Sequence, residues 1–584
     1  MRKGWIAALL GVGTLGLGLV RYRRPLIARL LRLPPAQYEV AVEPNLRIPM
    51  PDGTALYADR YLPVAPRSFP TILIRTPYGR EGDLGLFSVL IAMPARLFAA
   101  RGYHVIVQTT RGRFRSEGDF DPLVHEASDG QATLDWVLEQ PWFNGALGMW
   151  GPSYLGYVQW AVAANAPTAL KALMPMITSS RFSRLFYGDG ALTLDTLLRW
   201  LHLTHAMHGQ HRYLDLAAAR TLPASRTLHG LARELTTLPV SAADQATVGY
   251  PVPWYRNWIE QEDLRAPYWQ SVDHFAQLGK VQAPVHLVAG WYDIFLHAQL
   301  TDYASLLATG RPPYLTIGPY HHLTLSLNLD AVREGLAWFD AQLKGETQQL
   351  RKRSVRIYVM GAAEWHEMDF WPPPAKVHRL YLQPAKGLAE TKAPSAVAPS
   401  TYHYEPRDPT PSVGGVLMNE SAGPQNQHAL EVRRDVLTFT TEPLTTDLDV
   451  IGPVRLELFV RSSLAHTDFV GRLCDVHPDG ASYNVCEGMV RLKPDDGEVQ
   501  ADGTLRVEID LWATAQRFLR GHRIRLQVCS GAFPHWARNT GTGERLATAF
   551  RMVAADQLVY HDTEHPSVLI VPVVERAESG ERRT

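Results

Sequence analysis

A succession of short, apolar runs separated by helix-like stretches constrains the fold of this chain more than any other feature. The runs are TILIR, HVIVQ, ALGMW, LKALMPM, PVHLVAG and PYLTIG, at residues 71–75, 104–108, 146–150, 170–176, 284–290 and 313–318. Runs that are apolar throughout predict strands that are buried on both faces. Such strands are typical of a mostly parallel sheet that is covered by helices on both sides. We therefore predict an α/β domain, preceded by an antiparallel hairpin over residues 38–61 around the turn PDG.

The predicted sheet is interrupted between residues 181 and 277, where strand signals vanish. Helical patterns such as LTLDTLLRWLHLTH and TLHGLARELTTL take their place. We predict that residues 181–277 form an all-helical insertion, a cap over the carboxyl edge of the sheet. The α/β domain then consists of a first part, residues 38–180, and a second part, residues 278–370.

The chain changes character after residue 370. Residues 371–399 begin with WPPP and are rich in Pro, Ala and Ser, which indicates a linker. From residue 400 to residue 575, short alternating runs such as VRLELFV, LRVEIDLW and RIRLQVC succeed one another between Gly, Pro and Asp turns. This pattern predicts an all-β sandwich or jelly roll. Residues 576–584, RAESGERRT, are expected to be a disordered tail.

The amino-terminal residues 1–37 lie outside the predicted soluble fold. Residues 5–20 carry no charge and are followed by an arginine-rich flank. Because the apolar run meets RYRRP and no A-x-A-like cleavage site, we expect a retained hydrophobic anchor that contacts the membrane through residues 5–32. The excess of arginine after the run favours a protein body on the cytoplasmic side. Export by a secretory signal peptide is the alternative.

Charge and cysteine content narrow the partners of the chain. Lysine plus arginine and aspartate plus glutamate both total 58, so the chain lacks the net basic field that nucleic-acid binding exploits. Cys474, Cys486 and Cys529 lack the CxxC spacing of a zinc site and are expected to be inert thiols. The sequence contains no glycine-rich phosphate loop or dinucleotide fingerprint, and we predict no cofactor and no metal. The oligomeric state stays open.

The sharpest catalytic signal is the hexamer GPSYLG at residues 151–156, which lies between a predicted strand and a predicted helix. A sharp strand-to-helix turn with small residues beside the serine would project the hydroxyl of Ser153 over the sheet edge. The first turn of the helix also presents unpaired backbone N–H groups to a developing oxyanion. The second glycine follows the serine by three positions, not by the two of G-x-S-x-G, and a plain turn is the competing interpretation.

A serine nucleophile needs a base, and the base needs an acid that fixes its tautomer. Asp293 follows the predicted strand PVHLVAG, and His321 and His322 follow the predicted strand PYLTIG. The order serine, acid, histidine is that of α/β-hydrolases, and the carboxyl ends of parallel strands meet at one edge of the sheet. We therefore predict a triad of Ser153, Asp293 and a histidine. Spacing alone does not exclude His321 in favour of His322.

Two further groups of residues invite a functional interpretation. Four histidines recur every third residue in the cap: His202, His205, His208 and His211. Zinc on one helix prefers histidines four residues apart, so a water-facing cap explains these side chains better than metal binding. Trp150 and Trp291 are expected to pack in the core around the site, with recognition of the acyl group as the alternative.

Longer motifs carry a resemblance to a known family. They are RTPYGR, TTRGRFRSEGDFDP, LDWVLEQPWFNGALGMWGPSYLGYVQW, AGWYD, IGPYHH and WFDAQLKG, at residues 75–80, 109–122, 134–160, 289–293, 317–322 and 338–345. The chain resembles the cocaine esterase/X-Pro dipeptidyl-peptidase (CocE/NonD) family of serine hydrolases, over the α/β domain and more loosely over the β domain. The resemblance implies an α/β-hydrolase domain with a helical cap insertion, followed by an all-β jelly-roll-like domain.

The resemblance also implies roles for individual residues. It implies that Ser153 is the nucleophile, Asp293 the acid and His322 the base. It further implies that the Tyr78 hydroxyl and the Tyr154 backbone N–H form the oxyanion hole. Considered alone, the tyrosine at position 78 follows a strand and a proline, which fits a rigid loop over the site or a packed aromatic.

One position departs from the family pattern. Thr109 stands where the family usually has aspartate in a Q-D-x-R-G run. We interpret that aspartate as structural, so the departure puts the support of the fold near Arg111 in question more than the chemistry.

The implied reaction is acyl transfer to water from a small ester or a short peptide. Esterases, α-amino-acid ester hydrolases, acylases and X-Pro dipeptidyl peptidases share the triad within the family. A dipeptidyl peptidase must also hold the substrate amine, and Asp189, Asp195 and Glu260 are available carboxylates. The non-enzyme alternative is an inactive hydrolase scaffold whose β domain binds carbohydrate or a partner.

Overall fold

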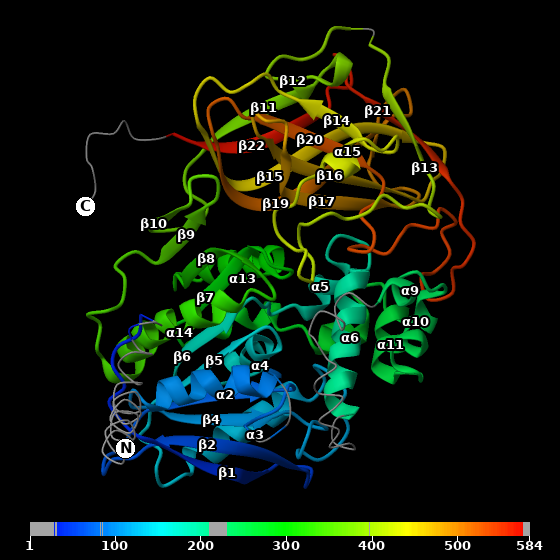
Figure 1. The fold of residues 1–584 in the computed structure, drawn as a ribbon. Coiled ribbons are helices and arrows are strands. Elements are labelled where there is room, and N and C mark those ends of the chain that lie inside the picture. Colours follow the sequence, from blue (N-terminus) through cyan, green and yellow to red (C-terminus); the bar gives the residue numbers. More distant parts are fainter. Residues whose placement is uncertain are drawn as a thin grey trace, which may run out of the picture.

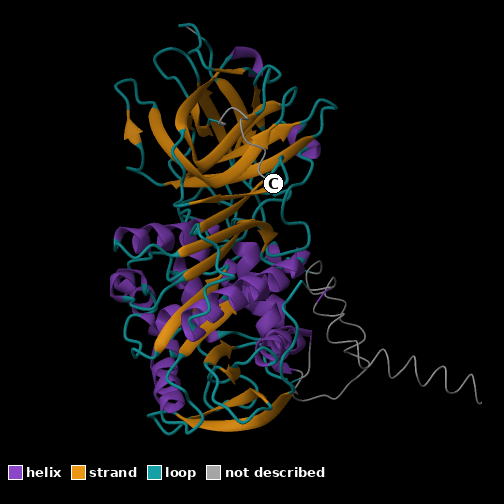
Figure 2. Cartoon of the chain, turned by 90° about the vertical axis from the view of Figure 1, so that its left-hand side faces the viewer, coloured by secondary structure: helices purple, strands orange, loops and turns teal. Residues whose placement is uncertain are grey.

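The computed structural model describes Arg29, residues 32–81, Asp83, and residues 86–209, 231–395 and 397–575, without the side chains of residues 86–90, 208 and 209. Figure 1 shows an α/β domain in the lower half and an all-β domain above it, with the cap helices beside the α/β domain. Figure 2 shows the same division from the side, with helices concentrated in the lower body and strands filling the upper one.

The α/β domain is built on a ten-stranded sheet in the order β1-β2-β4-β3-β5-β6-β7-β8-β9-β10. The strands are β1 (Val40–Pro49), β2 (Ala55–Pro63), β3 (Thr71–Thr76), β4 (His104–Thr109), β5 (Leu147–Pro152), β6 (Leu170–Met176), β7 (His286–Tyr292), β8 (Tyr314–His321), β9 (Val355–Val359) and β10 (Glu364–Met368). The six apolar runs form β3 to β8, which pair in parallel. Antiparallel pairing is confined to the two ends of this sheet.

Helices cover both faces of this sheet. They are α2 (Leu86–Ala99), α3 (Glu126–Leu138), α4 (Tyr154–Ala163), α13 (Leu296–Ala308) and α14 (Leu325–Phe339), with a π-helical turn at Asp340–Lys344. The alternation of β5 shows the two faces, because Trp150 packs on Phe98 of α2 while Gly151 lies against Leu155 of α4. Every residue of β3, β4 and β7 is buried. A strand covered on both faces in this way requires the unbroken apolar runs of the sequence.

The cap lies between β6 and β7. Its described helices are α5 (Phe182–Tyr187), α6 (Leu194–Gly209), α9 (Ala232–Leu235), α10 (Ala243–Val248), α11 (Pro253–Glu260) and α12 (Pro267–Ser271), with 3-10 turns at Val240–Ala242 and Phe275–Lys280. Stacked indoles hold these helices together. The ring of Trp200 on α6 lies 5.7 Å from that of Trp258 on α11, at an interplanar angle of 2°. Burial of such large aromatic surfaces stabilises the packing of the described cap helices.

The carboxy-terminal domain consists of an eight-stranded and a four-stranded sheet. Its strands are β11 (Lys376–Leu382), β12 (Leu388–Ala389), β13 (Ser400–Tyr404), β14 (Leu437–Thr440), β15 (Leu448–Ser462), β16 (Thr467–Val476), β17 (Ser482–Leu492), β18 (Glu498–Val499), β19 (Leu505–Phe518), β20 (Arg523–Cys529), β21 (Ala555–Tyr560) and β22 (Val568–Val574). Two short helices, Pro384–Lys386 and α15 (His428–Glu431), accompany them. Aliphatic residues of both sheets, such as Leu456 and Leu473, form a common core. The three cysteines are free thiols.

Most of the predicted anchor and all of the predicted tail lie outside the residues that the structure describes. Residues 1–28, 30 and 31 and residues 576–584 are not among the described residues. Within the described part of the chain, no helix combines the length and the apolarity that a membrane span requires. Membrane contact through residues 5–32 therefore stays a prediction.

Candidate active site

Ser153 occupies a sharp turn between β5 and α4. Its backbone angles are φ 56° and ψ −123°, a region that a side chain adopts only under strain and that marks nucleophile elbows. A Cβ on Gly151 would approach the Cβ of Leu155 to 2.4 Å, and one on Gly156 would approach Thr178 Cγ2 to 2.4 Å. Both glycines are thus required by close packing. The shifted second glycine lies where α4 crosses Thr178, which explains the departure from G-x-S-x-G.

A chain of hydrogen bonds joins the three residues that follow β5, β7 and β8. His322 Nε2 lies 3.0 Å from Ser153 Oγ, and His322 Nδ1 lies 2.8 Å from Asp293 Oδ2. Asp293 is fully buried, and its other oxygen accepts the backbone N–H of Phe295 at 2.8 Å. Ser153 is half-buried, and the side chain of His322 is 7% exposed. This arrangement can pass a proton from the serine to a histidine whose tautomer is held by a carboxylate.

His321, the competing base, points elsewhere. Its Nδ1 accepts the backbone N–H of Leu323 at 3.4 Å, and its own backbone N–H donates to Thr324 Oγ1 at 2.9 Å. Burial lowers the pKa of His321 below its usual value. The structure therefore brings the second histidine of the pair, and not the first, to the serine.

Tyr78 reaches the serine from the loop after β3. Its hydroxyl is hydrogen-bonded to Ser153, and it accepts the indole N–H of Trp200 at 3.0 Å. Because the indole donates to the tyrosine oxygen, the hydroxyl proton is left to point toward the serine. Burial raises the pKa of Tyr78, which keeps the hydroxyl protonated, as an oxyanion donor must be.

Tyr154 supplies the second predicted oxyanion donor. It is the first residue of α4, so its backbone N–H has no carbonyl one turn earlier to bind. Its side chain is fixed, because the hydroxyl donates to Glu126 Oε1 at 2.8 Å and accepts the Leu123 N–H at 2.9 Å. Its ring also stacks on Trp200, 6.1 Å away at 15°. The sequence did not single out Trp200, which lies within the periodic pattern of α6 like any core residue.

Buried charges support this corner of the site. Arg75 pairs with Glu126 at 3.0 Å and donates to Gln108 Oε1 at 2.8 Å. The Arg75 and Glu126 side chains are 0% and 5% exposed, so each charge depends on the other for compensation. Burial raises the pKa of Glu126 even beside the arginine. The pair connects β3 to α3 and, through the Tyr154 hydroxyl, to the start of α4.

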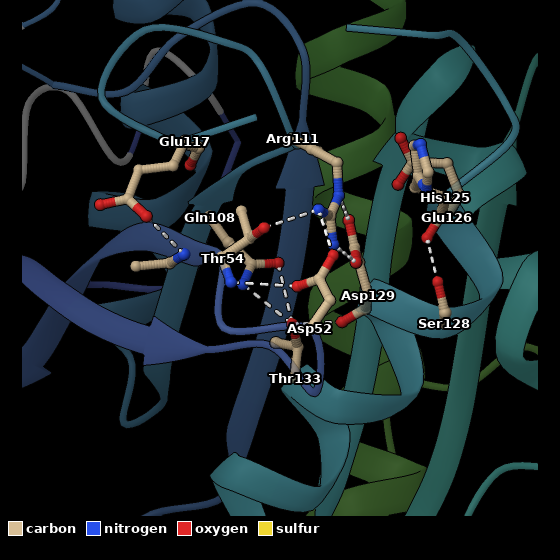
Figure 3. A network of polar contacts seen from close by, with 12 residues as sticks. Asp52, Thr54, Gln108, Arg111, Glu117, His125, Glu126, Ser128, Asp129 and Thr133 are labelled. Atoms are coloured by element: carbon tan, nitrogen blue, oxygen red, sulfur yellow. Dashed lines mark hydrogen bonds and ion pairs between the residues drawn. The ribbon is translucent and has the colours of Figure 1, made fainter. Parts of the chain in front are cut away.

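The departure at Thr109 leaves Arg111 well anchored. Figure 3 shows the Arg111 guanidinium between two carboxylates, Asp129 of α3 and Asp52 of the first hairpin. The distances are 2.6 Å to Asp129 Oδ1 and 2.7 Å to Asp52 Oδ2. Thr109 itself is hydrogen-bonded to Ser116, at 2.8 Å between the two hydroxyl oxygens. The support of Arg111 therefore does not depend on an acid at position 109.

Trp150 and Trp291, the two candidates for recognition of the acyl group, each pack on another aromatic ring. Trp150 is 2% exposed and packs on Phe98 of α2. Trp291 donates its indole N–H to the Tyr358 carbonyl at 2.6 Å and packs on Trp371. Both rings belong to the hydrophobic core, and recognition of the acyl group by either stays a prediction.

His202 and His205, the two cap histidines whose side chains the structure describes, share no ligand set with a third residue. His205 Nδ1 is bonded to the Leu201 carbonyl at 2.9 Å, and burial lowers the pKa of His202. Neither belongs to a group of three metal-ligating side chains within the described part of the chain. The side chain of His208 and the whole of His211 lie outside the described residues.

Comparisons with known proteins identify the family. A model described as X-Pro dipeptidyl-peptidase (S15 family) matches residues 52–324, and one for the X-Pro dipeptidyl-peptidase C-terminal non-catalytic domain matches residues 350–570. Cocaine esterase of Rhodococcus sp. (strain MB1 Bresler) is 34% identical over 92% of this chain and 99% of its own length. The chain belongs to the cocaine esterase/X-Pro dipeptidyl-peptidase family. This member is a serine hydrolase that acts on esters or peptides.

Solved structures share the architecture of this family member. An aminopeptidase from the marine sediment archaeon Thaumarchaeota archaeon has a TM-score of 0.74 at 23% identity, covering 92% of this chain and 97% of its own. An α-amino acid ester hydrolase has a TM-score of 0.71 at 22% identity, with the same coverage. The predicted fold class, an α/β-hydrolase domain followed by an all-β domain, is confirmed.

Proposed function

We propose that the chain hydrolyses carboxylic esters with Ser153 as nucleophile, His322 as base and Asp293 as the acid that orients the base. The observation that carries this proposal is the hydrogen-bonded chain of 3.0 Å and 2.8 Å between the three side chains. His322 takes the serine proton as Oγ attacks the carbonyl carbon, and returns it to the departing alcohol. Water, activated by the same histidine, then hydrolyses the acyl-enzyme.

Two donors stabilise the oxyanion in this proposal. The Tyr78 hydroxyl and the Tyr154 backbone N–H face the position of the carbonyl oxygen, and they donate without reorganising as charge develops. Trp200 is a positioning residue, because its N–H occupies the Tyr78 oxygen at 3.0 Å and leaves the hydroxyl proton for the substrate. The strained turn at Ser153 and the buried Arg75–Glu126 pair hold the two donors and the nucleophile in one geometry.

Tyr78→Phe is expected to lower kcat by about 10²- to 10³-fold, the usual loss for one oxyanion donor. The ring stays in place, so KM should change little. Tyr303→Phe is a matched control, since the hydroxyl of that tyrosine accepts the backbone N–H of Trp371 at 3.1 Å in the same domain. Steady-state kinetics on one nitrophenyl ester measures both variants. An unchanged kcat for Tyr78→Phe would remove Tyr78 from the oxyanion hole.

An ester substrate is favoured over a peptide by the likeness to a cocaine esterase, which is 34% identical over 92% of this chain. Two of the three carboxylates that could bind the amine of a peptide substrate are also poorly placed for that role. Asp195 is buried and paired with Arg199 at 2.6 Å, and Glu260 lies exposed at the end of α11. We therefore expect a short-chain nitrophenyl ester to be turned over faster than a Gly-Pro-nitroanilide.

The peptidase alternative rests on Asp189. This carboxylate lies between α5 and α6 and accepts the Trp512 indole N–H of the β domain at 3.5 Å. Burial raises the pKa of Asp189, and the neighbouring His297 and His535 oppose this rise. An ammonium group of a peptide substrate would suit such a site.

Side-by-side rates on the ester and the anilide, for wild type and Asp189→Asn, separate the two candidates. If the chain is an esterase, the ester rate exceeds the anilide rate and survives Asp189→Asn. Activity on the anilide alone, lost in Asp189→Asn while the variant remains folded by circular dichroism, would replace the esterase proposal with the peptidase one.

A further inference from the structure

A group of metal-ligating side chains lies in the β domain, outside the site described above. Asp475, His477 and His522 each offer one ligand atom, and these atoms lie within 4.8 Å of one another. In the part of the chain that the structure describes, this is the one such group of three. Two imidazoles with one carboxylate match the ligand sets of zinc and other divalent transition metals.

The backbone holds both histidines in tight turns. The turn from β16 to β17 is closed by hydrogen bonds from the His477 N–H to the Ala481 carbonyl at 2.8 Å and from the Gly480 N–H to the His477 carbonyl at 2.9 Å. The turn before β20 is closed by the His522 N–H and the Leu519 carbonyl at 3.0 Å. The two imidazole rings lie 4.4 Å apart between centroids. The ligands are thus brought together before any ion binds.

The carboxylate is oriented from both sides. Asp475 Oδ1 lies 2.8 Å from His522 Nδ1, and Oδ2 accepts the Gln516 side-chain N–H at 3.0 Å. His477 Nε2 lies 4.0 Å from Asp475 Oδ2. Zinc lies about 2.0–2.2 Å from nitrogen and oxygen ligands, so two ligands of one ion are at most about 4.2 Å apart. Small rotations of the side chains would meet this requirement.

The three side chains differ in how much of their surface is exposed to solvent. The side chains of Asp475 and His522 are 5% and 10% exposed, whereas that of His477 is 39% exposed. A buried aspartate–histidine pair with a more exposed second histidine gives an ion an entry path and a free position for water. An ion bound to His522 Nδ1 would take the place of the hydrogen bond between that nitrogen and Asp475 Oδ1.

We propose that Asp475, His477 and His522 bind one divalent transition-metal ion such as Zn²⁺. The ion connects the β16–β17 turn to the turn before β20. Gln516, which donates to Asp475, also lies at the junction of the two domains. There Met360, the residue after β9, forms two backbone hydrogen bonds with β19. Its N–H donates to the Ala515 carbonyl at 2.8 Å, and its carbonyl accepts the Arg517 N–H at 2.8 Å. An ion bound only by the folded state stabilises this junction.

Metal titration of the full chain without a polyhistidine tag, after dialysis against a chelator, tests the site. Zn²⁺ binding is measured by calorimetry, and Co²⁺ binding by its visible absorption. We expect one equivalent per chain, a higher Tm with Zn²⁺, and no competition from Mg²⁺, which prefers oxygen ligands. His477→Gln removes the most exposed ligand without disturbing the core and should weaken binding at least about tenfold.

His403→Gln is the matched control. This exposed histidine pairs with Asp556 at 2.8 Å on β13 and β21 of the same domain, without belonging to a group of three ligands in the described chain. It should bind Zn²⁺ like wild type. The proposal fails if wild type shows no saturable binding, if His477→Gln binds as tightly as wild type, or if both variants weaken binding equally. Ester turnover is expected to be unaffected by the chelator, so this test is independent of the proposed triad.

Discussion

Ser153→Ala is expected to reduce ester turnover by about 10⁵- to 10⁶-fold. Without the hydroxyl there is no acyl-enzyme, and the oxyanion donors alone retain only a small rate enhancement over water. A fluorophosphonate probe, which reacts with an activated serine, should label wild type and leave the variant unlabelled. This pair of measurements also separates an enzyme from an inactive scaffold.

Ser128→Ala is the control for Ser153→Ala. The Ser128 hydroxyl donates to the His125 carbonyl at 3.1 Å on an exposed part of α3, so its loss should leave turnover and labelling unchanged. Serine and alanine both carry a Cβ, so the strained backbone at position 153 costs about the same free energy in the variant, which is expected to fold like the wild type. A Ser153→Ala protein that is still labelled, or still turns over the ester, would show that the nucleophile is another residue.

His322→Gln is expected to lower kcat by about 10⁴- to 10⁶-fold, while His321→Gln stays close to wild type. Only His322 bridges the serine and the buried aspartate, at 3.0 Å and 2.8 Å. His321 contacts the backbone of its own loop. The two adjacent histidines therefore control for each other, and steady-state kinetics of the two variants measures the difference.

A base that works as neutral imidazole also implies a loss of activity in acid. Wild-type kcat/KM on one ester should fall as the pH is lowered from 8 to 5, and the residual activity of His322→Gln should not follow the same profile. Equal losses in the two histidine variants, or a wild-type rate that is flat over this range, would contradict a single base at position 322.

Much of the architecture follows from local sequence patterns. The six apolar runs form β3 to β8 because a strand covered by helices on both faces has to be apolar throughout. Ser153 directly follows β5, and Asp293 follows β7. Parallel strands expose their carboxyl ends at one edge, so residues far apart in sequence could be predicted to meet. The hydrogen bond between Ser153 and His322 spans 169 positions.

Other features could not be predicted from the sequence, because no periodic pattern or motif distinguishes the residues that form them. Trp200 has the spacing of a core residue on α6, and only the packing of the cap brings its N–H to Tyr78, 122 positions earlier. Asp475 and His522 lie 47 positions apart, at the end of β16 and just before β20, and they adjoin because these two strands pair. The closely spaced histidines of the sequence are those of the cap, whose described side chains share no ligand set.

The sequence by itself determined the fold class, the family and the small set of residues that could form a triad. Strand patterns and motifs are local, so they can be recognised without knowing how the chain packs. The tertiary structure decided which of two neighbouring histidines faces Ser153, how Trp200 orients the Tyr78 hydroxyl, and which side chains of the β domain converge on a candidate metal site. These are questions of direction and of distances of a few ångströms, and they depend on contacts between segments that the chain separates widely.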